Sequence, residues 1–259
     1  MTPAPSLPRV SVVVPTHERV ELCIRAVRSA LAQTVPPEEV LVWDDGSGAA
    51  TRERLRRFAA LHPQVRLHEG APARTPAVGR NRLIELARGD WVAMLDDDDE
   101  WLPDKLERQQ GYMDAWDVIA SGARRRSNGN LYLPHVGPVS RAALCRDNVL
   151  VLSTVTIRRS LVTHGFREDR ELAAIEDYCM WLDLADAGAR IVATPDVVAI
   201  YDDTGPDRLS DAPAAVQQRL ARHMYQRWRE RVSDYDAAVG AAVHASRAAK
   251  LRARELLRR

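Results

Sequence analysis

Short apolar runs alternate with helical patterns through the first 100 residues, and this alternation restricts the fold more than any other feature of the chain. The runs are almost continuously apolar, which is typical of strands buried on both faces of a sheet. Strands that alternate with helices predict βαβ units and a mostly parallel sheet. We expect strands at 10–14, 40–43, 65–68 and 91–95, and helices at 20–33, 51–61 and 79–88.

Beyond residue 100 the predicted elements are shorter and less regular. A helix is expected from Pro103 to about Trp116, and an amphipathic helix over 176–187 would end at Gly188 as its C-terminal cap. From residue 212 onward the chain reads as helix only. Further strands are expected at 118–120, 131–133, 151–157, 191–193 and 197–201.

The sequence therefore predicts an α/β domain over residues 1–211 and a basic helical extension over 212–259. Residues 219–259 carry eleven Lys or Arg and four Asp or Glu, a net charge of +7. Because the whole chain has a net charge of +1, the remainder carries −6. The extension is expected to pack on the body or on a second subunit of a homo-oligomer. An amphipathic helix on the inner face of a membrane, or a contact with nucleic acid, is the alternative.

The sequence also indicates a compartment. No run has the length needed to span a bilayer, and the first ten residues lack the apolar segment of a signal peptide. The three cysteines are isolated and have no CxxC spacing, which fits a reducing environment. We therefore expect a cytoplasmic protein, in which Cys23 packs in the core on a helical stripe with Val27, Ala30 and Leu31.

Polar segments follow three of the predicted strands, at 15–19, 44–47 and 96–99. In open α/β sheets, ligands bind beyond the carboxyl ends of the strands. These three loops are therefore predicted to form one site at one edge of the sheet.

The strongest chemical signal is the run of five acidic residues at 96–100. Helix capping before Pro103 accounts for one or two of these carboxylates, but not readily for all five. A divalent cation with oxygen ligands would relieve their repulsion, and it would offset the charge of a diphosphate leaving group.

Two further acidic segments allow two interpretations each. The turn at 44–47 is either a plain turn or a loop whose carboxylate accepts a hydrogen bond from a nucleobase, and the segment does not decide between them. Glu176 and Asp177 begin a helix, where acids commonly stabilise the helix dipole. One of them would be a general base only if other residues supplied the context.

Taken together, these segments resemble the family 2 glycosyltransferases, which have the GT-A fold. The resemblance extends from about Arg9 to Ser210. It divides the domain into a nucleotide-binding half at about 9–100 and an acceptor-side half at 101–211. The matching motifs are VSVVVPTHER (10–19), VWDDGS (42–47), GRNRLIELARGDWVAMLDDDD (79–99), STVTIRR (153–159) and EDYCMWL (176–182).

The resemblance implies roles for the matching residues. Asp96 and Asp98 would form a DxD motif that holds Mn²⁺ or Mg²⁺, with Asp98 the direct ligand. Asp177 would be the catalytic base, with Glu176 beside it. A nucleoside-diphosphate sugar, by default a UDP sugar, would lose its sugar to an acceptor hydroxyl with inversion. The nucleotide pocket would include Pro15, Thr16, Glu18, Arg19, Asp45 on the base, Arg80 near the diphosphate, Asp96 and Asp97.

The chain departs from the family pattern after its last predicted core strand. Residues 201–210 contain no His, where family members often carry one, and Asp203 or Thr204 stands in for it or the contact is absent. Arg208 is another residue that would reach the diphosphate. The absence of a QxxRW motif and of membrane spans argues against a processive polysaccharide synthase.

Two other function classes share parts of this pattern. A sugar nucleotidyltransferase would need a Gly-rich triphosphate loop after the first strand, and the sequence has none there. A silent nucleotide-binding module would not need the acids, which are present. The acceptor, which is a glycan, a lipid-linked or small molecule, or a nucleic acid, has no signature in residues 117–175.

Overall fold

The computed structural model describes residues 8–73 and 75–205, apart from the side chain at 171, and scattered positions between 233 and 249. The extension expected over 212–259 therefore lies almost wholly outside the described residues, as does Arg208. Where the structure describes positions 238–249, they are helical. None of the helices in the described part of the chain has both the length and the apolar character needed to cross a bilayer.

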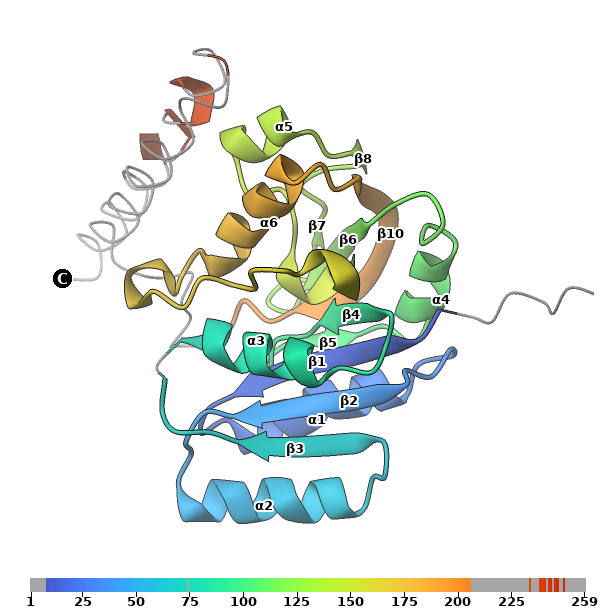
Figure 1. Cartoon of the computed structure of the whole chain (residues 1–259), viewed down its shortest axis with the longest axis vertical. Helices are drawn as coiled ribbons and strands as arrows, with labels where there is room; N and C mark the ends of the chain where they lie inside the picture. Colours follow the sequence, from blue (N-terminus) through green and yellow to red (C-terminus); the bar gives the residue numbers. More distant parts are fainter. Residues whose placement is uncertain are drawn as a thin grey trace, which may run out of the picture.

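One sheet runs through the described chain (Figure 1), with the strand order β3-β2-β1-β4-β9-β6-β10-β5. The strands of the nucleotide-binding half are parallel, whereas β9, β5 and the short β7 and β8 add antiparallel pairs. The bounds are β1 Val10–Thr16, β2 Glu39–Asp44, β3 Val65–Glu69, β4 Trp91–Met94, β5 Glu100–Trp101, β6 Val118–Arg125, β7 Leu131–Tyr132, β8 Gly137–Pro138, β9 Thr156–Arg158 and β10 Ile191–Tyr201.

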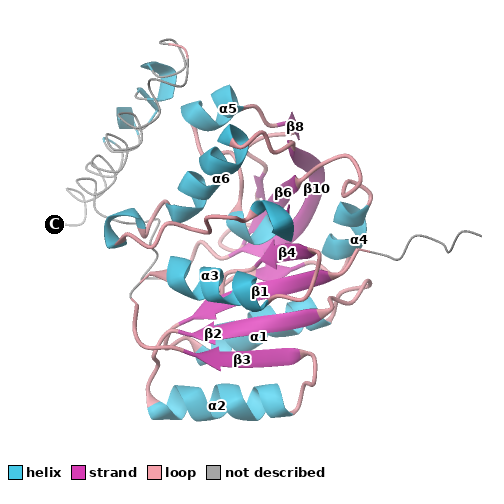
Figure 2. Cartoon of the chain, in the orientation of Figure 1, coloured by secondary structure: helices cyan, strands magenta, loops and turns pink. Residues whose placement is uncertain are grey.

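Helices cover both faces of this sheet (Figure 2). Helices α3 and α6 contribute to one hydrophobic core, and α1, α2 and α4 contribute to the other. The described helices are α1 Val20–Leu31, α2 Ala49–Ala60, α3 Pro76–Leu86, α4 Lys105–Gln110, α5 Arg141–Arg146 and α6 Glu176–Asp186.

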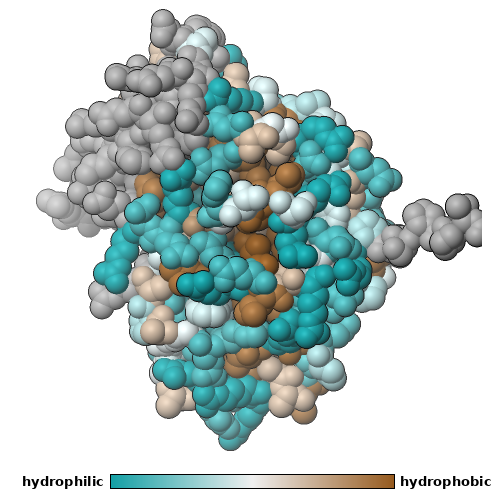
Figure 3. All heavy atoms as spheres, in the orientation of Figure 1, coloured by the Kyte–Doolittle hydropathy of each residue, from teal (hydrophilic) through white to brown (hydrophobic). Residues whose placement is uncertain are grey.

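The two cores explain the apolar runs in the sequence. Val12 and Val14 of β1 pack in one core, and Val13 between them packs in the other. Successive side chains of a strand point to opposite faces, so a strand covered on both faces has no polar side to alternate with. Outside the cores, hydrophilic side chains cover most of the face in Figure 3, around a band of hydrophobic ones.

One predicted strand is wrong. Residues 152–154 form a 3₁₀ helix instead of the first part of a strand over 151–157, and only β9 remains of that prediction. Two polar side chains of this segment form hydrogen bonds with backbone groups. Thr154 Oγ1 donates to Val151 O at 2.7 Å, and Ser153 Oγ accepts from Asp96 N at 3.1 Å.

Other boundaries differ in smaller ways. Helix α4 ends at Gln110, not near Trp116, and Gly111 is its C-terminal cap. The strands expected at 191–193 and 197–201 are one strand, β10, with an irregular register between Ala193 and Val197. Pro195 lies within that irregularity, where its missing N–H costs no ladder hydrogen bond. Gly188 ends α6 with a positive φ of 84°, as predicted.

Candidate active site

The three predicted polar loops meet at one edge of the sheet. Strand β1 is parallel to β2 and β4, so their carboxyl ends lie together. Strand β9 is antiparallel to both β4 and β6, so β6 and its parallel neighbour β10 point the same way as β4. The end of β10 thus joins the edge that carries the aspartates after β4.

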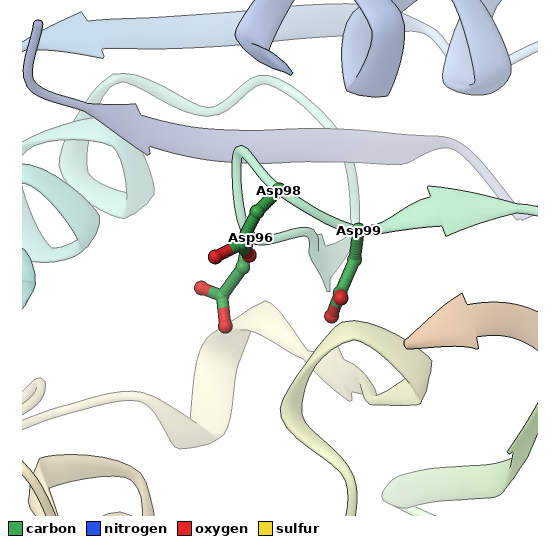
Figure 4. Close-up of side chains that lie close together, drawn as sticks. All are labelled: Asp96, Asp98 and Asp99. Carbon is green, nitrogen blue, oxygen red and sulfur yellow. The ribbon is translucent and has the colours of Figure 1, made fainter. Parts of the chain in front are cut away.

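The acidic loop between β4 and β5 forms a cluster of three carboxylates (Figure 4). Asp96, Asp98 and Asp99 each place one carboxylate oxygen within 4.8 Å of the others. Asp96 and Asp98 are the residues predicted as metal ligands, and Asp99 was not predicted. Asp99 is buried, and its Oδ1 accepts a hydrogen bond from Asp202 N at 2.7 Å.

The electrostatics of this cluster favour a cation. Burial raises the pKa of Asp99 well above its usual range, and the charges of Asp96 and Asp98 add to the shift. Burial and Asp96 also raise the pKa of Asp98. Carboxylate oxygens are the donors that Mg²⁺ and Mn²⁺ prefer. These residues therefore fit a divalent cation of that class.

Asp97 has a different environment from its neighbours. It is buried, and its Oδ2 accepts a hydrogen bond from Thr16 Oγ1 at 2.7 Å. Burial raises the pKa of Asp97 to about 7, against the pull of Arg19. The contact ties the acidic loop to the end of β1, so Thr16 and Asp97, both predicted in the nucleotide pocket, hold each other.

Arg80 joins the acidic cluster to the start of α6. Its Nη2 lies 2.7 Å from Asp96 Oδ1, and its Nη1 lies 2.6 Å from Glu176 Oε1. The side chain is only 4% exposed. Burial opposes its charge, but the two carboxylates outweigh burial and raise the pKa of Arg80. The buried guanidinium of Arg80 thus bridges Asp96, 16 positions away in the sequence, and Glu176, 96 positions away.

Asp177, the predicted base, directly follows Glu176 of that bridge in the sequence. It is half-buried, and its Oδ2 accepts a hydrogen bond from Asn148 Nδ2 at 3.1 Å. Burial raises the pKa of Asp177 above 3.8, although hydrogen bonds from Tyr178 N and Asn148 and the charge of Arg80 oppose the shift. Burial also raises the pKa of Glu176, to about 7. A carboxylate with a raised pKa is suited to accept a proton.

The loops after β1 and β2 are held together on the nucleotide side. Glu18 has a positive φ of 58°, and its carboxylate accepts hydrogen bonds from Gly48 N and from Thr51 Oγ1. It therefore caps α2 at the site edge. Asp45 Oδ1 accepts a hydrogen bond from Ala73 N at 3.0 Å. Pro15 lies under Gly79, where an added Cβ would approach its side chain to 3.3 Å.

Four residues anchor the acidic loop to the end of β10, and of these the sequence indicated only Glu100, the last residue of the acidic run. Arg25 donates to Asp98 O at 2.8 Å and to Asp202 Oδ2 at 3.2 Å, and it pairs with Glu100 at 2.9 Å. Arg126 also contacts Glu100 and Asp202. No local pattern reveals this group, because its members come from α1, β5, the hairpin after β6 and the end of β10.

The residues proposed in place of the missing His have other contacts. Asp203 accepts hydrogen bonds from Ser127 N and Oγ and lies 3.4 Å from Arg125. Thr204 donates to Asp202 Oδ1. The described part of this segment reaches the acidic cluster through its backbone, where Asp202 N donates to Asp99 Oδ1.

A family model described as "Glycosyl transferase family 2" matches residues 11–164, which is more than half of the chain. The chain belongs to this family. One relative is the succinoglycan biosynthesis protein ExoO of Rhizobium meliloti (strain 1021), which is 32% identical over 213 residues. That match covers 75% of this chain and 61% of the relative, so the family 2 chain described here spans less than two thirds of that protein.

Solved structures show the same fold. TarS 1-349 of S. aureus in complex with UDP-GlcNAc has a TM-score of 0.63 and 19% identity, over 84% of this chain and 70% of that one. A mannosyltransferase of Pyrobaculum calidifontis in complex with GDP-Man and Mn²⁺ has a TM-score of 0.65 and 23% identity, over 98% and 81%. These similarities confirm the GT-A fold predicted from the motifs.

Proposed function

We propose that this protein is an inverting glycosyltransferase that moves a sugar from a nucleoside-diphosphate sugar to an acceptor hydroxyl. The bridge made by Arg80 carries this proposal, because it brings the acidic cluster and the start of α6 to one centre. A leaving diphosphate and an attacking hydroxyl need a cation site and a base on opposite sides of one carbon. Asp96 and Asp98 supply one side and Asp177 supplies the other.

In the proposed reaction Asp177 takes the proton of the acceptor hydroxyl while the oxygen of that hydroxyl bonds to the anomeric carbon. The bond from that carbon to the diphosphate oxygen breaks, and its electron pair stays on the leaving group. Asn148 orients the Asp177 carboxylate through its hydrogen bond. Mn²⁺ or Mg²⁺ held by Asp96, Asp98 and Asp99 would offset the charge of the leaving diphosphate.

The donor side of the site is the edge formed by the loops after β1 and β2. Pro15, Thr16 and Arg19 follow or end β1, and Asp45 follows β2, where its carboxylate faces the loop at Ala73. UDP is the default nucleotide. Solved structures with this fold hold UDP-GlcNAc and GDP-Man, so nucleotides with uracil and with guanine both have to be tested as donors.

The relative named for succinoglycan biosynthesis supports a saccharide as the acceptor. A saccharide hydroxyl, free or lipid-linked, is therefore the first class to screen. The GT-A fold by itself does not select one sugar over another.

The test is a calorimetric titration of the protein with UDP, dTDP and GDP, with and without Mn²⁺. We expect one nucleotide to bind in a Mn²⁺-dependent way, and Asp98→Ala to weaken that binding at least about tenfold, since the substitution removes a charged ligand. Asp114→Ala is the matched control, because Asp114 is exposed and lies outside the cluster. Failure of all three nucleotides to bind would remove the enzyme proposal.

Asp177→Asn separates binding from chemistry. The amide keeps the shape of the carboxylate but accepts no proton, so we expect nucleotide affinity to stay within about twofold and turnover to fall about 10²–10⁴-fold, the range of general-base effects. Hydrolysis of the matching nucleotide sugar gives the readout when no acceptor is known. Unchanged turnover in Asp177→Asn would exclude Asp177 as the base.

A further inference from the structure

Arg19 lies directly on the acidic cluster. It follows β1 at the N-terminal end of α1, and its Nη1 is 2.8 Å from Asp98 Oδ2 and 3.4 Å from Asp97 Oδ1. Asp98 is the residue expected to bind the cation directly. The guanidinium therefore lies on a carboxylate oxygen of the residue that is expected to bind the cation.

Arg19 and Arg80 differ in their freedom to leave the cluster. Arg80 is 4% exposed and fixed between Asp96 and Glu176, whereas the side chain of Arg19 is 44% exposed. Within the described residues, both ion pairs of Arg19 go to the acidic loop. A long side chain at the surface moves at little cost in packing. Of these two arginines, Arg19 is therefore the one whose side chain is able to move.

The charges indicate when it would move. A divalent cation placed on Asp98 would lie within a few ångströms of the guanidinium, and like charges at that separation repel. A nucleoside diphosphate would bring new anionic oxygens to the same place, which a guanidinium binds well. Arg19 should therefore oppose the cation alone and favour the cation together with a diphosphate.

We propose that Arg19 is an exchangeable counter-ion, which holds Asp98 before the cation binds and transfers to the donor diphosphate when the cation binds. This inference rests on the proposed function, because the diphosphate is that of the donor. The transfer of Arg19 from Asp98 to the diphosphate makes the binding of the cation and of the nucleotide cooperative. By linkage, the factor by which the nucleotide raises Mn²⁺ affinity equals the factor by which Mn²⁺ raises nucleotide affinity.

The test compares wild type with Arg19→Met, which removes the charge and retains much of the length of the side chain. Mn²⁺ alone is titrated while free Mn²⁺ is followed by its electron paramagnetic resonance signal. The nucleotide that wild type prefers is then titrated at saturating Mn²⁺. Because typical coupling is about 5–150-fold, we expect Arg19→Met to bind Mn²⁺ alone at least about fivefold more tightly. We expect it to bind the nucleotide at least about fivefold more weakly.

Opposite signs in the two titrations distinguish exchange from damage to the site, which would weaken both. Arg19→Lys retains the charge and is expected to keep the weak binding of Mn²⁺ alone. Arg28→Met is the matched control, since Arg28 is an exposed arginine of the same helix that stacks near Phe58, outside the cluster. Arg19→Gln repeats the neutral substitution if Arg19→Met fails to fold by circular dichroism.

Two results overturn the inference. One is that a folded neutral variant binds Mn²⁺ alone no more tightly than wild type. The other is that neither protein binds Mn²⁺, because there is then no cation for Arg19 to oppose. Failure of the proposed function gives a different result: wild type binds none of the three nucleotides with Mn²⁺, while the titration of Mn²⁺ alone still decides whether Arg19 opposes the cation.

Discussion

Asn148 shows how one uncharged side chain adjusts the proposed base. Its Nδ2 donates to Asp177 Oδ2, and this hydrogen bond favours the ionised carboxylate against the burial that disfavours it. A base acts only when it is deprotonated, so turnover should fall as the pH falls through the pKa of Asp177. Because that pKa is raised, the acidic limb of the pH–rate profile should lie at a higher pH than an ordinary aspartate would give.

Asn148→Ala removes the donor and should raise the pKa of Asp177 further. We therefore expect the acidic limb of kcat/KM to move to higher pH, with turnover at the alkaline plateau changed less than at acidic pH. The measurement is donor hydrolysis across the pH range for both proteins. Asn130→Ala, at an exposed position in the hairpin after β6, is the control. An unmoved limb with lower activity at every pH would mean that Asn148 only shapes the pocket.

At the scale of elements, the acidic loop owes its position to contacts from both ends of the domain. Arg25 of α1 and Asp202 after β10 meet at the loop between β4 and β5, and Asp202 N bonds to the carboxylate of Asp99. The hairpin after β6 adds Arg126. The loop is therefore held by α1 and by the end of β10, whose residues Arg25 and Asp202 are 177 positions apart in the sequence.

Asp202→Asn tests this anchoring. The amide keeps the backbone contact to Asp99 but loses the charge that holds Arg25 and Arg126. Because the group is partly buried, we expect a lower melting temperature and Mn²⁺-dependent nucleotide binding weakened by about threefold to tenfold. Asp203→Asn is the matched control, since Asp203 pairs with Arg125 and Ser127 and not with the acidic loop. Equal losses in the two variants would count against a special role for Asp202.

At the scale of the whole molecule, Lys105 of α4 is a fully buried amine. Its Nζ donates to Gln109 Oε1 at 2.8 Å and to Thr156 Oγ1 at 2.9 Å, and it lies 4.2 Å from the centre of the Trp101 ring. Burial lowers the pKa of Lys105 well below 10.5. The unfolded chain therefore binds a proton more readily than the folded one between the two pKa values.

The sign of the pH dependence follows. The contribution of Lys105 to stability is greatest above pH 10.5 and declines as the pH falls toward its lowered folded pKa. Lys105→Met removes this dependence, and Gln109 Oε1 still receives a hydrogen bond from Thr156 Oγ1. Urea denaturation should show that the variant gains stability relative to wild type at pH 7 and gains less at pH 10. A gain that does not change with pH would mean that Lys105 is charged in the folded state.

Features that depend on neighbouring residues could be predicted from the sequence alone. Apolar runs and helical spacing predicted the strands and helices of residues 9–100 within a few positions, because a strand buried on both faces leaves a continuous local pattern. The acidic run and its place after a strand predicted the edge of the site. Predictions were poorer beyond residue 100, where elements such as β5, β8 and α5 are too short for periodicity to show.

Which of these side chains meet depends on how the chain folds in three dimensions. It separated Asp97, which binds Thr16, from the cluster of Asp96, Asp98 and Asp99. It joined Arg80 to Glu176 across 96 positions, and it placed Arg19 on Asp98 across 79. Spacing along the chain carries no information about such pairs, because they form when separate strands bring their ends to one edge of the sheet.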